Sequence, residues 1–265
     1  MMRAVSTLLV TLAFTLVVLA AFATGWLVRR RGHGPVGNGH SIAYVSMAFA
    51  FILGLVLSMA IGHYDDARNN AQAEAAKITA VLGAANPLPT AQRTLIQTDT
   101  LCVMHSIVDD EWPLMRAGDD EGSPTTNTAQ DKLFNDISAL STTDPLVTRQ
   151  YGSLFGNVLA HGEMRDQRLV DGIPRVPLHV WLLLAILAYV VVLFIALHEH
   201  IPSRRAWAAI GTLLGVTIIA TIAVMSMLDH PYEPGLAISP YAMERSIAIL
   251  HDVGSATGSQ VTCPT

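Results

Sequence analysis

The sequence predicts an all-α integral membrane protein, with four transmembrane helices in two hairpins and a helical polar insert between spans two and three. Only 14% of the 265 residues are charged and 51% are hydrophobic, whereas a soluble domain carries about 25% charged residues. Four stretches lack Asp, Glu, Lys and Arg, and each is long enough to cross a bilayer, which takes about 20 helical residues. They are residues 5–28, 41–63, 177–198 and 206–228.

The first stretch is predicted to remain in the protein as a membrane anchor. Ala21, Phe22 and Ala23 resemble the small-residue cleavage site of a signal peptide, which is the alternative. The apolar run continues past this site to Val28, however, and ends at the arginines of 29–31. A basic flank at that end is typical of a retained span.

The positions of the spans define the expected organisation. Residues 1–63 form the first transmembrane hairpin, 64–176 the helical polar insert, 177–228 the second hairpin and 229–265 a polar tail. Within the insert, residues 69–85 are expected to prolong the second span as one helix, because they are rich in Ala, Glu and Gln and contain no proline. Further helices are expected from Thr90, as a cap, to residue 112, over 131–140, and from Asp144 to Arg168, with a solvated loop at 118–128.

The loops that close the two hairpins, 29–40 and 199–205, are short and dense in arginine. Because such loops tend to stay in the cytoplasm, the insert and the tail are predicted to be extracytoplasmic, in a multi-pass protein of the plasma or inner membrane. The insert is acidic, with 16 Asp and Glu against 9 Lys and Arg over residues 63–175. It therefore offers a surface for a partner protein.

The two cysteines lie on the same side of the membrane in any four-span arrangement. Cys102 is in the insert and Cys263 is in the tail. If that side is oxidising, a disulfide between them would tie the tail to the insert. The alternative is two separate buried thiols.

Residues 109–115, DDEWPLM, place three acids before a tryptophan and a proline. The proline must kink or end the helix, and one interpretation is a helix break with solvated acids. The sharper hypothesis is that Glu111 forms a two-pronged hydrogen bond with Arg165 or Arg168, with Trp112 packed beside the pair, which would hold two helices in register. A Ca²⁺ site is a third option, but the run lacks the alternating oxygen ligands of a calcium loop, so no metal site is predicted.

The second span carries small side chains at intervals of four residues, a pattern that lets helix backbones approach closely. They are Ser46, Ala50, Gly54, Ser58 and Gly62. This small-residue stripe either packs within the four-helix bundle or forms a subunit interface or the lining of a pore. The fourth span has two glycines, Gly211 and Gly215, at the same spacing.

The fourth span ends in LDHPYEPG, residues 228–235. Asp229 ends the apolar run, the prolines beginning with Pro231 preclude further helix, and Tyr232 suits the interfacial zone of a membrane. One interpretation is a structural elbow at the membrane exit. The other is a pair of functional acids, Asp229 and Glu233, near a pore mouth.

These motifs, in this order, resemble a bestrophin-like family of bacterial membrane proteins that carries a domain-of-unknown-function label. The resemblance covers nearly the whole chain, and it rests on AEAA (73–76), PLP (87–89), EWP (111–113), the two insert arginines and LDHPYEPG. This chain departs from the pattern at Tyr232, where phenylalanine is more usual, by an extra residue before Gly235, and in its cysteine-bearing tail. The resemblance implies a distant similarity to bestrophins, which are oligomeric anion channels with four spans per subunit. It also implies a cytosolic helical domain, opposite to the orientation that the arginine-rich loops favour.

The chemistry of the sequence narrows the functions that remain. The apolar cores contain no Asp, Glu, Lys or Arg, so a proton-coupled transporter would lack its usual pathway. Residues 198–200, HEH, do not have the spacing of helix-borne zinc ligands, and neither a phosphate-binding glycine loop nor a nucleophile elbow is present. The protein is therefore predicted to be no enzyme, to need no cofactor and to bind a lipid bilayer rather than nucleic acid. Two functions remain for a homo-oligomer, namely an anion-permeable pore and a non-conducting envelope scaffold whose acidic insert binds a partner protein.

Overall fold

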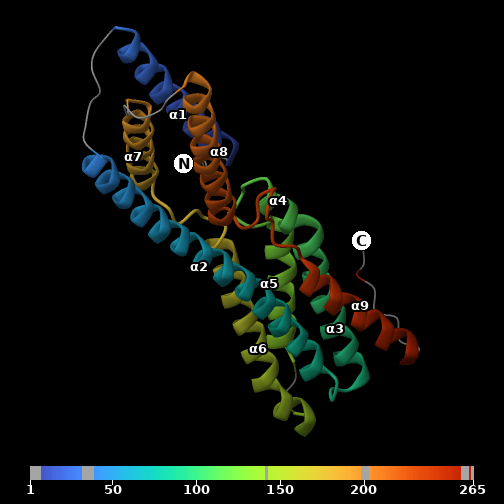
Figure 1. Cartoon of the computed structure of the whole chain (residues 1–265). Coiled ribbons are helices and arrows are strands. Elements are labelled where there is room, and N and C mark those ends of the chain that lie inside the picture. Colours follow the sequence, from blue (N-terminus) through green and yellow to red (C-terminus); the bar gives the residue numbers. More distant parts are fainter. Residues whose placement is uncertain (1–6, 32–38, 141–142, 198–202, 258–262, 264–265) are drawn as a thin grey trace. The chain divides into compact units, whose positions relative to one another are not determined.

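The computed structural model describes residues 7–31, 39–140, 143–197, 203–257 and 263, and the regular elements in these ranges are all helical (Figure 1). They are α1 (Thr7–Arg30), α2 (Gly39–Ala85), α3 (Thr90–Ser106), the π-helix η1 (Ile107–Glu111), α4 (Trp112–Arg116), α5 (Pro124–Ser138), α6 (Pro145–Val170), α7 (Leu178–Leu197), α8 (Arg204–Asp229) and α9 (Tyr241–Thr257). The predicted all-α class is confirmed. The HEH run at 198–200 and most of the loop at 29–40 lie outside the described residues.

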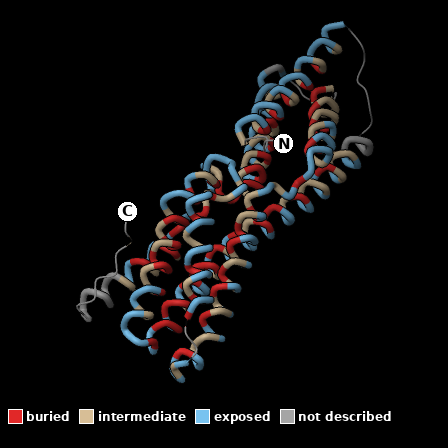
Figure 2. The backbone as a smooth tube through the Cα atoms, turned by 180° about the vertical axis from the view of Figure 1, so that it is seen from behind, coloured by how far each residue is buried: buried red, intermediate tan, exposed pale blue. Residues whose placement is uncertain are grey.

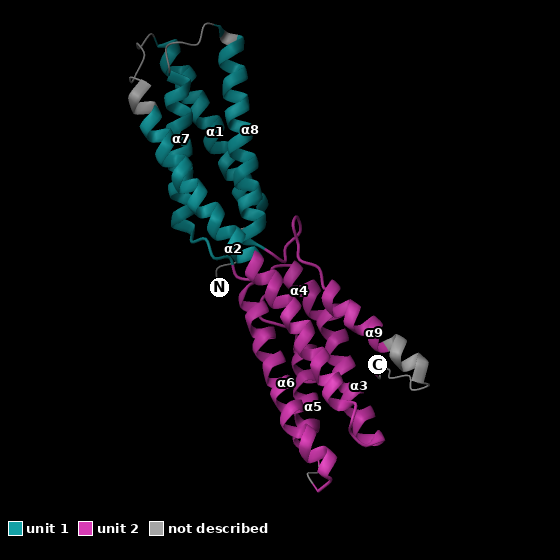
Figure 3. Cartoon of the chain, turned by 60° about the horizontal axis from the view of Figure 1, so that its bottom comes forward, with its two compact units in different colours: residues 1–64, 174–230 teal, residues 65–173, 231–265 magenta. Residues whose placement is uncertain are grey.

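The chain forms two compact units, which Figure 3 shows in different colours. Unit 1 comprises residues 1–64 and 174–230, and unit 2 comprises residues 65–173 and 231–265. Four helices, α1, α2, α7 and α8, are long and apolar enough to cross a membrane. The prediction of four spans is therefore confirmed.

Apolar side chains from all four spanning helices meet in the core of unit 1. Among the buried residues are Phe14, Val56, Leu184 and Ile222. Helix α1 packs against α7 and α8, and a Cβ on Gly25 of α1 would lie 2.6 Å from the Cβ of Ala196 in α7. The pairing of the spans into two hairpins stays a prediction.

Unit 2 is a helical bundle around its own apolar core. Residues 65–85 of α2 contribute to it, so the second span continues as one helix as expected. The largest buried apolar side chains include Ile78, Ile96, Leu133 and Leu154. Figure 2 shows buried positions recurring at intervals along these helices, which is the pattern of amphipathic helices that share a core.

Some helix boundaries differ from those expected. Helix α3 starts at Thr90, but no side chain caps its N-terminus, so Thr90 is its first residue rather than its cap. Helix α5 starts at Pro124 instead of residue 131, because proline fits the first turn of a helix, where its missing N–H has no partner to lose. The loop expected at 118–128 is correspondingly shorter.

Of two further helices of unit 2, α6 was predicted from the sequence and α9 was not. Helix α6 begins as predicted, since the carboxylate of Asp144 accepts the backbone N–H of Leu146 at 2.8 Å. Helix α9 was not expected in the polar tail. Its buried residues Met243 and Ile247 stand four positions apart, and this spacing is the signal that could have revealed it.

Candidate functional site

The small-residue stripe lies on the outward face of α2 in unit 1. Four of its members are exposed and Ser46 is half-buried; the exposed ones are Ala50, Gly54, Ser58 and Gly62. A Cβ built on Gly54 or Gly62 would meet no atom of the described residues within 4 Å. The stripe therefore does not pack inside the helical bundle of one chain.

The glycines of the fourth span behave differently. A Cβ on Gly211 of α8 would collide with the ring of Phe22 in α1, and a Cβ on Gly215 would lie 3.1 Å from a methyl carbon of Val18. These glycines let α8 approach α1 closely. Small residues at the same four-residue spacing therefore pack against a neighbouring helix on α8, whereas on α2 they face away from the described residues of unit 1.

The carboxylate of Asp229, at the end of α8, accepts hydrogen bonds from the backbone of the segment that precedes α7. Its Oδ1 accepts the backbone N–H of Arg175 at 3.0 Å and that of Val176 at 3.1 Å. The Nδ1 atom of His63 in α2 lies 3.7 Å from the same oxygen. Because Asp229 is 0% exposed, this geometry favours a structural elbow over an acid exposed at a pore mouth.

Tyr232 belongs to unit 2 and is buried there. Its hydroxyl donates to the carbonyl oxygen of Ala67 at 3.2 Å, and its ring meets Trp112 edge to face with centroids 5.9 Å apart. Burial raises the pKa of the Tyr232 hydroxyl above its ordinary value. Tyr232 is therefore held by packing within unit 2, and its place in the interfacial zone of a membrane stays a prediction.

Residues 231–235 of the LDHPYEPG run form a turn in unit 2. The carbonyl oxygen of Pro231 accepts the backbone N–H of Ile238 at 2.8 Å, which closes the turn. Glu233 is half-buried, with its carboxylate against Gly118.

Two acids and two arginines form a buried charge network in unit 2. Arg165 donates from Nε to both oxygens of Glu111 at 3.1 Å, and from Nη2 to Oε1. Arg168 donates from Nη2 to Glu111 and, at 3.1 Å, to Oε1 of Glu74, while its Nε bonds to Oε2 of Glu74. The backbone N–H of Ser123 completes the shell of Glu111 at 3.1 Å. Both predicted arginines, rather than one of them, contact Glu111.

The network balances its charges away from water. Glu74, Glu111 and Arg168 are each 0% exposed and Arg165 is 6% exposed, so two carboxylates face two guanidinium groups in a place where an unpaired charge would be costly. Burial alone would raise the pKa of Glu111, but the hydrogen bonds from Arg165 and the charges of Arg168 and Arg165 hold that pKa below its ordinary value. Burial also opposes the charge of Arg168, but Glu74 and Glu111 raise its pKa. For Glu74, burial outweighs the charge and the hydrogen bonds of Arg168, and the pKa is raised above its ordinary value. Glu111 is therefore the acid whose charged form the arginines favour.

The π-helix η1 decides which acid of the DDE run enters this network. A π-turn inserts one residue into an α-helix, and here it covers the whole run. Asp109 and Asp110 are exposed, whereas Glu111 is buried. Pro113 follows in the first turn of α4. The stretch is thus a helix irregularity with two solvated acids and one acid turned into the core.

Trp112 links this network to the tail. Its Nε1 donates to the carbonyl oxygen of Ile238 at 3.1 Å. The guanidinium carbon of Arg168 lies 4.7 Å from the centre of the indole ring, within the range of a cation–π contact. Trp112 is 2% exposed, so its role is packing.

Two residues in or beside the buried charge network, Glu74 and His161, were not predicted from the sequence. Glu74 lies in the AEAA motif, where a single acid among alanines on a long helix was the available signal. His161 is 0% exposed, and neither of its ring nitrogens has a hydrogen-bond partner among the residues that the structure describes. Its Nε2 is 3.8 Å from Oε1 of Glu74. Burial and the charges of Arg168 and Arg165 lower the pKa of His161 to about 3, so the imidazole is neutral at physiological pH.

The cysteine pair and the acidic runs complete the predicted sites. Cys102 and Cys263 form a disulfide with their Cα atoms 5.2 Å apart, which confirms the bridge between insert and tail. In the acidic run of residues 119–121, the other stretch where a Ca²⁺ site was an option, Asp119 Oδ1 accepts the backbone N–H of Glu121 at 3.1 Å. Among the described residues, no group of three or more His, Cys, Asp and Glu is placed to hold a metal ion.

Comparisons with known proteins agree with this architecture. A family model described as the Bestrophin-like domain matches residues 8–243. A bacterial bestrophin homologue from Klebsiella pneumoniae, crystallised as a single-residue variant, matches with a TM-score of 0.67 at 14% identity, over 91% of this chain and 99% of that chain. Another crystallised membrane protein variant matches with a TM-score of 0.69 at 15% identity, over 94% of this chain and 98% of that chain. No curated protein matches the chain.

Proposed function

Because this chain belongs to the bestrophin-like family, we propose that it assembles as a homo-oligomer in the membrane and forms an anion-permeable pore lined by the outward face of α2. The observation that carries this proposal is the unpartnered small-residue stripe, whose glycines have no atom within 4 Å of an added Cβ. The anion selectivity rests on the resemblance to bestrophins.

Large apolar side chains are exposed on both α2 and α8. On α8, Leu213 is 71% exposed and Val216 is 59% exposed, and such side chains suit contact with lipid tails. On α2, Phe51 and Leu55 are exposed beside the small-residue stripe. Small residues on a spanning helix suit close contact with another helix or a solvent-filled lumen, so the stripe is the part of α2 that we assign to a central axis.

The chemistry of the stripe is compatible with passage of an anion. Its members carry no formal charge, and the four apolar cores contain no Asp, Glu, Lys or Arg, so no fixed negative charge within the bilayer would repel an anion. The hydroxyl groups of Ser46 and Ser58 are the hydrogen-bond donors on this face. A hydroxyl can turn its hydrogen toward a passing halide.

Planar-bilayer recording of the purified protein tests the pore. Chloride-dependent single-channel steps are expected. In a Ser58→Cys variant, a charged thiol reagent should change the current, whereas the same reagent on Val216→Cys at the lipid-facing control position should not. The native cysteines are joined in a disulfide, so the unmodified protein should not respond. Silence from a verified oligomer would refute the pore and favour the scaffold.

We further propose that unit 2 is extracytoplasmic. The disulfide between Cys102 and Cys263 supports this orientation, because structural disulfides are rare in the cytosol. The arginine-rich loops of the spans support it independently. Reporter domains placed after Glu121 and after residue 265 should both be active only outside the cytoplasm. Cytoplasmic activity of both would reverse the orientation while leaving the pore untouched.

A further inference from the structure

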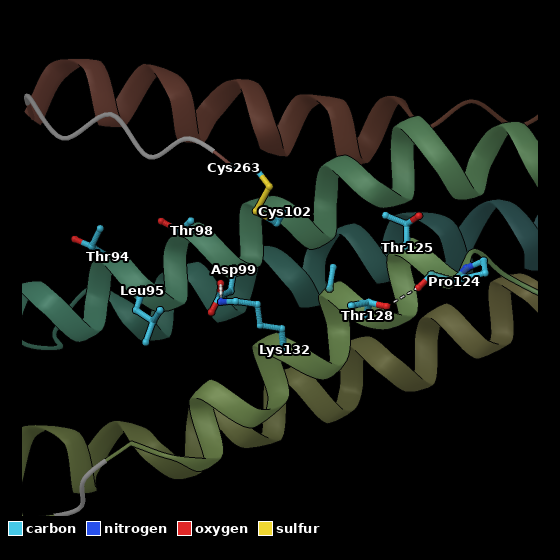
Figure 4. Close-up of a pocket in the computed structure, with 11 residues that line it drawn as sticks. Thr94, Leu95, Thr98, Asp99, Cys102, Pro124, Thr125, Thr128, Lys132 and Cys263 are labelled. Atoms are coloured by element: carbon cyan, nitrogen blue, oxygen red, sulfur yellow. Dashed lines mark hydrogen bonds and ion pairs between the residues drawn. A yellow bond between two sulfur atoms is a disulfide. The ribbon is translucent and has the colours of Figure 1, made fainter. Parts of the chain in front are cut away.

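A groove of about 890 Å³ lies between α3 and α5 in unit 2 (Figure 4). This volume is in the range of small-molecule sites, which are mostly apolar with a few polar groups. The disulfide between Cys102 and Cys263 lies along one side. The groove belongs neither to the buried charge network nor to the spanning helices.

The walls of the groove combine apolar surface with hydroxyl groups. The hydroxyl-bearing residues come from both helices and are Thr94, Thr98, Thr125 and Thr128. Each threonine presents a methyl group beside an oxygen that can accept a hydrogen bond. The described residues that line the groove include no aromatic side chain.

Asp99 supplies the negatively charged group among the residues that line the groove. Its side chain is 4% exposed, and its Oδ1 is bonded by the ammonium group of Lys132. The other oxygen, Oδ2, is buried, and within the described part of the chain no group donates a hydrogen bond to it. A buried carboxylate oxygen of this kind is costly unless a donor satisfies it.

Lys132 does not neutralise the acids around it. It also donates to Asp136 at 2.9 Å, so one ammonium group serves two carboxylates and one negative charge is left over. Burial and the neighbouring Asp136 raise the pKa of Asp99, as expected where carboxylates outnumber cations. Because the Lys132 side chain is 58% exposed, it can turn toward Asp136 and leave Asp99 accessible to another donor.

We propose that this groove binds a primary organic amine, with its ammonium group on Oδ2 of Asp99 and its apolar body along the threonine methyls and the disulfide. The surplus negative charge disfavours an anion. A neutral ligand would leave the surplus charge uncompensated. A quaternary ammonium has no N–H to donate, and the aromatic surface that usually receives it is not among the lining residues.

Calorimetric titration of the full-length protein in lipid nanodiscs tests this proposal. The probe is n-butylammonium, and the matched compounds are n-butanol and butyltrimethylammonium. The primary amine should bind at least tenfold more tightly than either. Asp99→Asn should weaken its binding at least tenfold. The control Asp131→Asn, which removes a charge from an exposed position of the same groove-forming helix α5, should leave binding within about twofold.

Two further variants separate binding from folding. Lys132→Met removes the competing ammonium group, so n-butylammonium should bind more tightly, an outcome that loss of structure would not produce. Cys102→Ser removes the disulfide from the side of the groove and should weaken binding. The proposal is overturned if no probe binds up to about 10 mM, if butanol binds as well, if Asp99→Asn has no effect, or if Lys132→Met weakens binding. None of these readouts depends on conduction, so the pore and the amine site can fail separately.

Discussion

Replacing Glu111 with glutamine should destabilise unit 2 strongly. The carboxylate accepts hydrogen bonds from Arg165, Arg168 and the Ser123 backbone. Glutamine keeps one acceptor oxygen but presents an NH₂ group to donors, and it leaves the buried network with two guanidinium groups against the single carboxylate of Glu74. Removing one partner of a buried ion pair costs about 3–5 kcal/mol. Because Glu111 is 0% exposed, solvent does not screen this loss, and the upper half of the range applies.

The free energy of unfolding can be measured by urea titration in micelles, followed by tryptophan fluorescence, since Trp112 packs against the network. The neighbouring Asp110→Asn is the matched control, because Asp110 is exposed and should change stability by no more than about 0.5 kcal/mol. A Glu111→Gln effect as small as that of the control would refute the reasoning.

A double-mutant cycle separates the charge imbalance from lost packing. In Glu111→Gln/Arg165→Met, one carboxylate faces one guanidinium again, so the double variant should be less destabilised than the sum of the two single variants, by about 1–3 kcal/mol. Additive effects would show that the two residues do not share the penalty of an unpaired buried charge.

Three other predictions concern His161 and two glycines of the spans, Gly211 and Gly54. The pKa of His161 is about 3 in the folded protein, against an ordinary value of 6.5. Below pH 6.5 the unfolded chain therefore binds a proton that the folded chain does not bind. The free energy of unfolding should fall as the pH falls. The loss should reach about 2 kcal/mol between pH 6.5 and pH 5, seen as a lower Tm, and His161→Gln should flatten this dependence; equal slopes in both proteins would exclude His161 as its source. Gly211→Leu should drive a side chain into Phe22. This overpacking should lower the free energy of unfolding by about 1–3 kcal/mol, and the Tm should fall. Gly54→Leu should leave the Tm within a few degrees but reduce the oligomer size in gel filtration with light scattering; the reverse pattern would place the subunit interface elsewhere.

The sequence alone determined the four spans, because a helix of about 20 uncharged residues has few other stable environments. It also determined the continuous second helix and the Asp144 cap, which depend on interactions within a few residues of the chain. A helix irregularity beside Pro113 was expected as well, but the structure places it before the proline, in η1 at residues 107–111. The cysteine pair could be predicted for another reason, because the order of the spans places both residues on one side of the membrane.

The tertiary structure decided which faces and partners these elements have. Glu74 and Arg168 are separated by 94 residues, and nothing local shows that an acid in an alanine-rich helix will be buried against a distant arginine. The burial of Tyr232 against Trp112, the neutral state of His161 and the open glycine face of α2 have the same origin. Each depends on how whole helices pack, and a periodic pattern states only that a helix has two faces, without stating what covers either of them.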